Sequence, residues 1–446
     1  MFSKTSEAMF AASLFSYTAA NSLRSHISAS PIFIIQTYTF LYFWLDLTTG
    51  EIYMHRCLQL AQLGEGKVAP NPMVGAVLVS ENRIIGEGYH QLFGQAHAEV
   101  NCINAVAEQD IPLIQKATLY VSLEPCAHFG KTPPCADLII KHKIPKVVIG
   151  CRDPFAQVNG KGIEKLQAAG IEVIVGVLEN ECLALNKRFF IFHKQRRPYV
   201  ILKWAQTGDG KIAAPSNSPS RGETQAQPSL FRDIEADLNS STSEASARMA
   251  SPTGGGREGA SRLLISNEFT NRLVHKWRSE EAAILVGTNT ALFDDPELTT
   301  RLWPGTNPIR LVVDMNLRLP QSLKLLDGNT PTIVFNLQQH TLPVEKTSPA
   351  DLKNTVGYYQ VTEDVSLVQQ LLNALYQMNI QSVLVEGGAQ LLQSFINDGS
   401  WDEARIISNE QLMIGDGLPA PLLKNQQLIN IQNIATDTIR IYQNSQ

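Results

Sequence analysis

The chain has 446 residues, of which 44% are hydrophobic, and it carries a formal net charge of -5 at pH 7. This length is sufficient for two or three domains with large cores. The slightly acidic balance argues against a nucleic-acid-binding or membrane-surface protein, because both classes need clustered positive charge. The six cysteines are too sparse for a disulfide framework and favour reduced thiols in the cytoplasm.

The first 50 residues are treated as an extension of uncertain status. Residues 32–45 are apolar and aromatic, but this run is shorter than the roughly 20 residues of a membrane-spanning helix. Lys4 and Arg24 upstream leave a signal or transit peptide open. Because no Ala-x-Ala-like cleavage site follows the run, we favour an appended or misassigned start, ahead of a domain that begins near Tyr53.

Between residues 53 and 175, apolar residues alternate between helical and strand spacing. Such alternation is typical of a layered α/β domain. The expected helices cover residues 53–63, 136–143 and 162–169, with a further helix starting at His97. The expected strands cover residues 76–79, 83–89, 118–123, 146–150 and 171–175.

Two short motifs in this half carry the residues of a metal site. An imidazole and two thiols, from His97, Cys126 and Cys135, suit Zn²⁺ and leave its fourth position open for water. The metal lowers the pKa of such a water to about 7. Glu99 is two residues beyond the histidine and is the expected proton carrier. Zinc nucleobase deaminases use the same arrangement, in which the metal activates water and the glutamate transfers its proton. Their two cysteines are separated by two residues, whereas eight residues separate Cys126 from Cys135.

A second α/β series begins near Pro198. Its expected strands cover residues 199–205, 282–287, 309–314, 332–335, 382–386 and 404–407. A helix is expected over residues 267–277, with Ser266 as its N-cap and with Phe269, Leu273 and Trp277 on one face. Residues 215–259 are rich in Ser, Pro, Ala and Gly, and this composition predicts a disordered insertion.

The motifs of both halves resemble RibD, the bifunctional deaminase–reductase family of riboflavin biosynthesis. The first-half matches are residues 71–75, 86–90, 97–99, 124–135, 153–154 and 158–162, and the 124–135 run is the most specific of them. The second-half matches are residues 202–211, 287–290, 294–301, 310–314 and 386–388. The resemblance implies a cytidine-deaminase-like α/β/α domain in residues 51–196 and a dihydrofolate-reductase-like α/β domain in residues 197–446.

The resemblance also implies two consecutive reactions on a small phosphoribosylaminopyrimidine. The first half would use Zn²⁺ to deaminate 2,5-diamino-6-(5-phosphoribosylamino)pyrimidin-4(3H)-one to 5-amino-6-(5-phosphoribosylamino)uracil. The second half would use NADPH to reduce the ribosyl group of that product to a ribityl chain. The expected enzyme is a homo-oligomer that binds neither nucleic acid nor membrane.

Residue roles follow from the same resemblance. The positions that would contact NADPH, near a loop from Gly388 to Ser394, are Ala205, Thr290, Asp294 and Gly388. The substrate positions are Asn71 in the deaminase, and Lys203, Arg278, Leu298, Arg301 and Glu386 in the reductase. An ordinary Asn-Pro turn is the alternative for Asn71. Arg278 and Arg301 would bind the ribose phosphate through their guanidinium groups. The alternative for both is a surface arginine without a ligand. Apart from the resemblance, Lys203 or Asp209 is expected to assist protonation. His128 is an alternative zinc ligand, but three protein ligands suffice, so we expect it to line the deaminase pocket or meet the phosphate.

Two departures from the family pattern affect the second half. Leu264 stands where the family has Trp, and the 215–259 insertion falls just before it. The alternative is therefore a deaminase whose reductase-like domain is a binding or assembly module. A third hypothesis, a deaminase that edits nucleic acid, predicts a basic groove around the zinc site.

Overall fold

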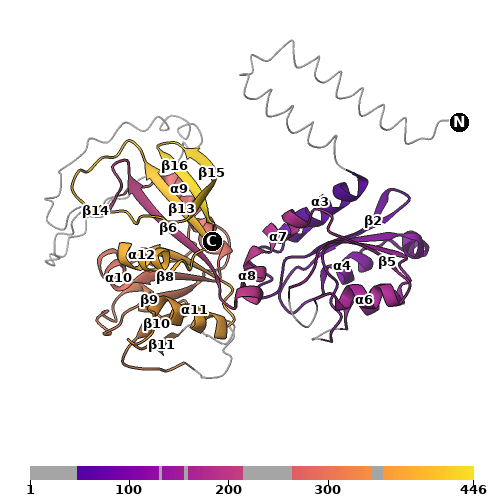
Figure 1. Ribbon diagram of the computed structural model, residues 1–446, viewed down its shortest axis with the longest axis horizontal. Coiled ribbons are helices and arrows are strands. Elements are labelled where there is room, and N and C mark those ends of the chain that lie inside the picture. Colours follow the sequence, from indigo (N-terminus) through magenta and orange to yellow (C-terminus); the bar gives the residue numbers. More distant parts are fainter. Residues whose placement is uncertain (1–47, 130–132, 155–158, 214–263, 343–354, 446) are drawn as a thin grey trace, which may run out of the picture.

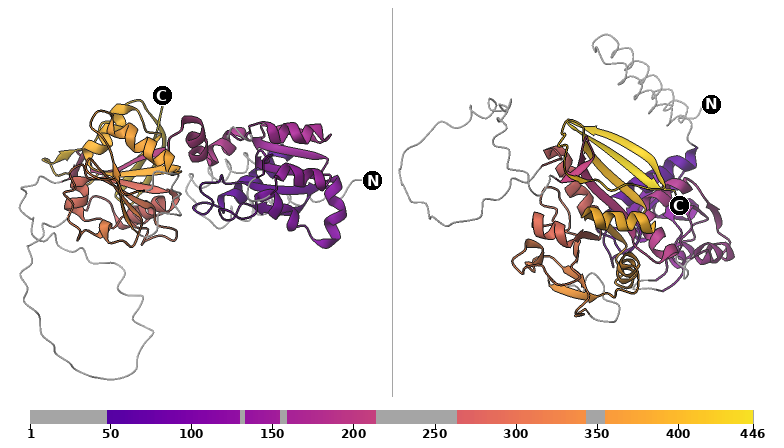
Figure 2. Two further views of the ribbon diagram at one scale, coloured as in Figure 1. Left: turned by 90° about the horizontal axis from the view of Figure 1, so that it is seen from below. Right: turned by 60° about the vertical axis from the view of Figure 1, so that its left-hand side comes forward.

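The computed structural model describes residues 48–129, 133–154, 159–213, 264–342 and 355–445. The predicted insertion at 215–259, and all but the last residues of the 1–50 extension, lie outside these ranges. Two sheets form the cores of two separate halves that meet along one side (Figure 1, and Figure 2, left).

The first half is a five-stranded sheet between two helical layers. Its strands follow the order β2-β1-β3-β4-β5, in which β1 is antiparallel to both neighbours and β3, β4 and β5 are parallel. The strands are β1 (Gly75–Ser80), β2 (Arg83–Tyr89), β3 (Thr118–Leu123), β4 (Lys146–Cys151) and β5 (Glu172–Val175). Helices α4 (Ala98–Asn104), α5 (Cys135–Lys141) and α6 (Lys161–Ala168) pack into one core, and α3 (Thr49–Gln62) and α7 (Glu179–Leu185) into the other. The 3₁₀ segment η1 (Glu108–Lys116) precedes β3.

Helix α3 starts earlier than its apolar spacing predicts. The Thr48 hydroxyl accepts a hydrogen bond from the Glu51 amide, and the Glu51 carboxylate accepts one from the Thr48 amide. This capping box satisfies two amides that a helix start leaves open. The described part of the first half therefore includes Thr48, a residue expected from the sequence to belong to the extension.

The second half is built on a nine-stranded sheet with the order β11-β10-β9-β8-β12-β6-β13-β16-β15. Its strands are parallel from β11 to β13, and β16 and β15 add an antiparallel hairpin at one edge. The parallel strands are β6 (Tyr199–Thr207), β8 (Ala283–Gly287), β9 (Ile309–Val313), β10 (Thr332–Asn336), β11 (Val356–Gln360), β12 (Ser382–Gly387) and β13 (Glu403–Asn409). The hairpin is β15 (Gln426–Ile434) and β16 (Asp437–Asn444), and β7 (Lys211–Ala213) pairs separately with β14 (Leu418–Pro419).

Helices cover both faces of this sheet as well. Helices α11 (Leu367–Gln377) and α12 (Ala389–Asp398) bury their apolar sides in one core. Helices α9 (Glu268–Glu280) and α10 (Thr288–Asp294) do so in the other, which also contains η2 (Lys324–Leu326). The layered α/β architecture expected for each half is confirmed.

Three local predictions in the second half are wrong. The N-cap of α9 is Asn267, whose side chain accepts a hydrogen bond from the Thr270 amide, and not Ser266. The buried stripe of that helix includes Thr270 and Val274, whereas Phe269 is 57% exposed, because its position faces away from the sheet. The segment expected as a loop from Gly388 to Ser394 is the beginning of α12, with Gly388 as its N-cap.

Helix α8 (Lys187–Gln195) connects the halves and packs on both. Phe189 and Phe190 belong to a core of the first half, and Ile191 packs against a core of the second. Arg188 forms a bidentate ion pair with the fully buried carboxylate of Glu281, just before β8. The proposed boundary between residues 196 and 197 therefore follows a helix that both halves share.

Gly88 lets the helix that follows His97 lie directly on β2. A Cβ at Gly88 would come within 2.2 Å of the Cys102 amide nitrogen and 2.7 Å of the Ala98 carbonyl oxygen, both in α4. Only a residue without a side chain allows this approach. The position of α4, and with it the positions of His97 and Glu99, depends on this contact.

We expect Gly88→Ala to lower the free energy of unfolding by about 1–3 kcal/mol, because the added methyl group overpacks the contact with α4. Chemical denaturation of the full chain measures the change. Gly50→Ala is the control, since its Cβ would meet only the Thr48 hydroxyl, at 3.9 Å. Equal stability of the two variants would contradict this account of Gly88.

Candidate active sites

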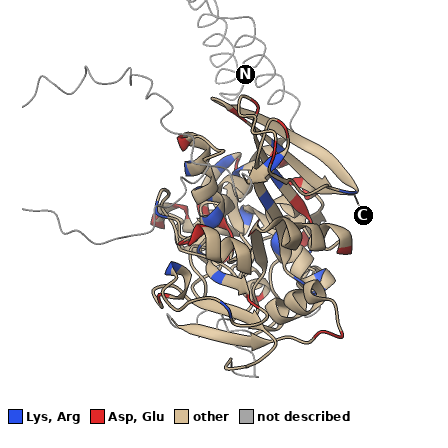
Figure 3. Ribbon diagram, turned by 90° about the vertical axis from the view of Figure 1, so that its left-hand side faces the viewer, with Lys and Arg blue, Asp and Glu red and all other residues tan. Residues whose placement is uncertain are grey.

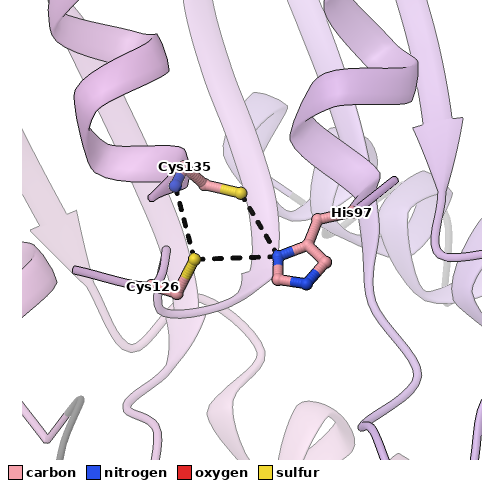
Figure 4. Close-up of side chains that lie close together, drawn as sticks. All are labelled: His97, Cys126 and Cys135. Carbon is pink, nitrogen blue, oxygen red and sulfur yellow. Dashed lines mark hydrogen bonds between the residues drawn. The ribbon is translucent and has the colours of Figure 1, made fainter. Parts of the chain in front are cut away.

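Three separate segments bring the predicted zinc ligands together. His97 is the N-cap of α4, Cys126 follows the end of β3, and Cys135 is the first residue of α5. His97 Nδ1 lies 3.7 Å from Cys126 Sγ and 3.4 Å from Cys135 Sγ (Figure 4). The three ligand atoms all lie within 4.8 Å of one another.

This geometry fits a tetrahedral zinc ion. Zinc bonds of about 2.3 Å to sulfur and about 2.0 Å to nitrogen place a sulfur and a nitrogen ligand about 3.5 Å apart. The fit requires Nδ1 of His97 as the ligand atom, which the sequence could not specify. Hydrogen bonds from Cys135 and His97 lower the pKa of the Cys126 thiol to about 4, and the hydrogen bond with Cys126, together with burial, raises the pKa of Cys135. A thiolate is therefore already favoured by the protein's own groups.

Glu99 lies in the wall of a cavity that two of the zinc ligands, His97 and Cys126, also line. The cavity has a volume of about 370 Å³ and is also lined by Asn71, His90 and His128. Burial of the Glu99 side chain raises the pKa of its carboxyl, and the neighbouring Cys126 raises it further. A raised pKa suits a group that must both take up and release a proton near neutral pH.

Asn71 is oriented by His90, a residue to which the sequence analysis gave no role. Asn71 Nδ2 lies 3.1 Å from His90 Nε2, and His90 Nδ1 lies 3.0 Å from the Ala96 carbonyl oxygen. The carbonyl can only accept, so His90 Nδ1 carries the proton and Nε2 accepts from the Asn71 amide. The Asn71 carbonyl oxygen is then left as an acceptor for an amine or ring N–H. The Gly-Tyr-His motif at residues 88–90 was the available signal for His90.

Glu124 is not a zinc ligand but binds the backbone at the start of α6, next to the zinc site. Its buried carboxylate accepts hydrogen bonds from the backbone amides of Asp153, Gly160, Gly162 and Ile163, at 3.0–3.4 Å. These contacts fasten the start of α6 to the segment that carries Cys126. The sequence motif contained Glu124 but gave no indication of this structural role.

In the second half, the predicted cofactor residues lie on β6, on α10 after β8 and directly after β12, towards the carboxyl ends of neighbouring parallel strands. Ala205 lies near the end of β6, Thr290 and Asp294 lie in α10 after β8, and Gly388 follows β12. Ligands of open α/β sheets bind at this edge. A Cβ at Gly387 would lie 2.9 Å from the Thr290 side chain, and Gly388 has a positive φ of 82°. The narrow glycine turn leads into the N-terminus of α12, whose free amides suit the phosphates of NADPH.

The predicted substrate residues include a buried ion-pair cluster at the same edge. Arg278 in α9 donates two hydrogen bonds to the Glu386 carboxylate, at 2.8 and 2.7 Å, and a third to the Thr299 carbonyl oxygen at 3.2 Å. Lys203 Nζ lies 3.8 Å from the same carboxylate. These cations hold the pKa of Glu386 at about 2 despite its burial. The Arg278 guanidinium is thus already hydrogen-bonded within the protein.

Arg301 and Leu298 have different environments. The Arg301 side chain is 55% exposed and contacts Glu297 at 3.4 Å, so its guanidinium faces solvent. The Leu298 side chain is buried in the core beside α9, with a positive φ of 54°. A substrate could therefore reach only the backbone of Leu298. Leu264, at the position of the expected Trp, is 73% exposed.

Comparison with known proteins gives two family matches. Residues 47–151 match the cytidine and deoxycytidylate deaminase zinc-binding region, and residues 198–439 match the RibD C-terminal domain. The chain is 37% identical to the riboflavin biosynthesis protein RibD of Aquifex aeolicus, over 82% of this chain and 88% of that protein. It is 32% identical to RibD of Escherichia coli, over 82% and 89% of the two chains.

Solved structures agree with these matches. A diaminohydroxyphosphoribosylaminopyrimidine deaminase/5-amino-6-(5-phosphoribosylamino)uracil reductase from Thermotoga maritima is similar with a TM-score of 0.68 and 33% identity. The similarity covers 89% of this chain and 99% of that one. Acinetobacter baumannii RibD gives a TM-score of 0.70 and 29% identity, with the same coverage of both chains.

The fold and the two sites define a zinc-dependent deaminase joined to an NADPH-dependent reductase. The matches extend over most of the chain and include both halves. The chain belongs to the RibD family and is a bifunctional enzyme of riboflavin biosynthesis that acts on a small pyrimidine. The predicted family, fold class and cofactors are confirmed. Across the described ranges, no helix combines the length and hydropathy needed to cross a membrane.

We expect Glu124→Gln to lower the free energy of unfolding by about 1–3 kcal/mol, because the amide group turns one acceptor of backbone hydrogen bonds into a donor. Thermal or chemical unfolding of the full chain measures the loss. Glu164→Gln on the exposed face of α6 is the matched control and is expected to be neutral. A Glu124→Gln variant as stable as this control would show that the backbone contacts do not hold α6.

Proposed function

We propose that the first half deaminates 2,5-diamino-6-(5-phosphoribosylamino)pyrimidin-4(3H)-one and that the second half reduces the ribosyl group of the product. The observation that carries the first assignment is the convergence of His97 Nδ1 and two cysteine sulfurs beside a buried carboxyl in one cavity. The Thermotoga maritima relative, a diaminohydroxyphosphoribosylaminopyrimidine deaminase and 5-amino-6-(5-phosphoribosylamino)uracil reductase, supports the choice of substrate.

In the proposed deaminase site, His97, Cys126 and Cys135 hold zinc. When bound, zinc supplies a Lewis acid that makes water a nucleophile at neutral pH. Glu99 accepts a proton from the attacking water and passes it to the amine, so the carbon–nitrogen bond breaks and ammonia leaves. The raised pKa of the buried carboxyl supports this exchange.

We assign pyrimidine binding to Asn71. Its amide group donates to His90, so its carbonyl oxygen remains to accept a hydrogen bond from the substrate. His128 lines the same cavity and would contact the ribose phosphate side of the substrate. The contact with His90 and the position of Asn71 in the cavity wall support this role over the simple Asn-Pro turn.

In the proposed reductase site, NADPH supplies the hydride, and the protein orients the two reactants and excludes water. Ala205, Thr290, Asp294 and Gly388 would bind the cofactor at the carboxyl edge of β6, β8 and β12. Lys203 and the Arg278–Glu386 pair lie at this edge and would position the ribosyl group. Asp209 is bound to Thr207 and to the Gly415 amide, which favours Lys203 over Asp209 as the proton donor.

Arg301 is the proposed phosphate ligand. Its exposed guanidinium can form a bidentate contact with phosphate. The fork of Arg278 already binds Glu386, so its proposed role is to orient that carboxylate rather than to bind phosphate.

The remaining expectations stay predictions: a homo-oligomeric enzyme of the cytoplasm that binds neither nucleic acid nor membrane. Six free cysteines support a reducing compartment. Basic and acidic residues are interspersed along the elements of the second half (Figure 3), which gives no support to a nucleic-acid-binding stripe there. The intact glycine turn and ion-pair cluster support a working reductase over a non-catalytic binding module.

We expect Cys135→Ser to reduce zinc content. Loss of a residue that only hydrogen-bonds to a ligand lowers metal affinity roughly 10–100-fold, and loss of a ligand itself should lower it further. Metal analysis and ammonia release by the full chain measure the result. Glu99→Gln is the counterpart: it should retain zinc while kcat of deamination falls by roughly 100- to 10,000-fold, the usual contribution of general acid–base catalysis. Unchanged zinc content in Cys135→Ser would remove that residue from the ligand set.

For the reductase, we expect Arg301→Ala to raise the KM for the deaminated substrate about tenfold, which corresponds to about 1.4 kcal/mol. The KM for NADPH should stay unchanged, because the arginine is assigned to the substrate phosphate. Arg272→Ala, an exposed position in α9, is the control. A rise in the KM for NADPH alone would place Arg301 at the cofactor instead.

A further inference from the structure

Two residues of the reductase half lie in the wall of the deaminase cavity. Asn379 and Gln381 come from the turn between α11 and β12, yet they line the same cavity as His97 and Glu99. The first half therefore does not enclose this cavity alone.

Gln381 is fixed in its own half and reaches into the other. Its carbonyl oxygen accepts a hydrogen bond from the Tyr199 amide at 2.8 Å, next to the parallel pairing of β12 and β6. Its side chain amide donates to the Pro70 carbonyl oxygen at 2.6 Å, and the residue is buried. Pro70 immediately precedes Asn71.

Asn186, directly before α8, binds the other end of the loop that carries Asn71. The Asn186 side chain accepts a hydrogen bond from the Met73 amide at 2.8 Å and donates to the Met73 carbonyl oxygen at 2.9 Å. Asn71 thus lies in a four-residue loop, residues 70–73, with an amide side chain from outside the loop bound at each end. The side-chain amide of Asn71 donates a hydrogen bond to His90, which directly follows β2.

Helix α8 keeps the two anchoring points in a fixed relation. It begins directly after Asn186, and Arg188 ties it to the buried Glu281 of the second half. Phe192 in α8 packs against Tyr376 in α11, with ring centroids 4.8 Å apart. The turn that carries Gln381 follows α11, so the ion pair and the ring contact hold it against the loop.

We propose that Gln381 is a positioning residue for the deamination reaction: through Pro70 it sets the position of Asn71, and the reductase half thereby completes the deaminase pocket. The proposal rests on the pyrimidine-binding role proposed for Asn71. Gln381 does not touch the reacting atoms. Its effect falls on substrate binding, because loss of its hydrogen bond releases one end of the loop without changing the zinc ligands or Glu99.

The test is the steady-state kinetics of full-length Gln381→Met, which retains the length of the side chain but cannot donate a hydrogen bond. The KM of deamination should rise between about three- and tenfold, the range expected from the loss of one hydrogen bond. The deamination kcat should stay within about twofold, and zinc content should be unchanged. Gln381→Glu, which presents an acceptor to the Pro70 carbonyl, should raise KM further.

Two controls separate positioning from general damage. Gln377→Met changes an exposed glutamine at the end of α11 and should leave the deamination KM unchanged. The reductase KM and kcat of Gln381→Met should equal those of the unmodified chain, because Gln381 lies at the start of β12 and the cofactor edge at its end. A parallel fall in both activities would overturn the proposal in favour of a merely structural role.

Asn71→Ala and the double variant distinguish this inference from the function on which it rests. Because Gln381 acts through Asn71, Gln381→Met should add no further rise in KM when Asn71 is already alanine. Full additivity, or an unchanged KM in Gln381→Met, would overturn the inference while leaving the role of Asn71 intact. An unchanged KM in Asn71→Ala would overturn the proposed role of Asn71 itself.

Discussion

The metal site of the first half depends on one imidazole nitrogen and two sulfurs that come from three segments of the chain and lie within 4.8 Å of one another. The contacts around them serve this meeting. Gly88 allows α4 to lie on β2, which places His97, and Glu124 fastens the start of α6 beside Cys126. The hydrogen bond from the Cys135 amide to Cys126 Sγ joins the remaining two ligands. The lowered pKa of the Cys126 thiol favours a thiolate, the form that binds a metal ion.

The second half solves a related problem with ion pairs. Glu386 is buried at the cofactor edge, and its charge is maintained by Arg278 and Lys203. Breaking such a pair leaves an uncompensated buried charge, which is far more costly than the pair itself is stabilising. The shared helix α8 connects this half to the deaminase through Arg188, so the two sites belong to one continuous structure rather than to two domains on a flexible linker.

Sequence reasoning found the zinc ligands because they occur in two short motifs, each with its own local chemistry. It also placed β2 and β3 correctly. β3 is a mostly apolar and buried run, whereas β2 begins with two exposed residues and is marked by the Glu81-Asn82 turn before it. It misplaced the cap of α9 by one residue, because Ser266 and Asn267 are both good caps and only tertiary contacts of Asn267 decide between them. Gln381 could not be found in this way, because its partner Pro70 is 311 positions distant and no local pattern links the two. The ion pair between Arg278 and Glu386 could not be predicted either, since the two residues are 108 positions apart.

In the function proposed above, both halves are active and act in sequence on one pyrimidine. The most direct measurement follows ammonia release and NADPH oxidation together, in the full chain supplied with the diaminopyrimidine substrate. We predict ammonia release with or without NADPH and, when NADPH is present, oxidation of one NADPH for each ammonia released, after a lag in which the deaminated product accumulates. Ammonia release without any NADPH oxidation would contradict the account and leave the second half as a binding module.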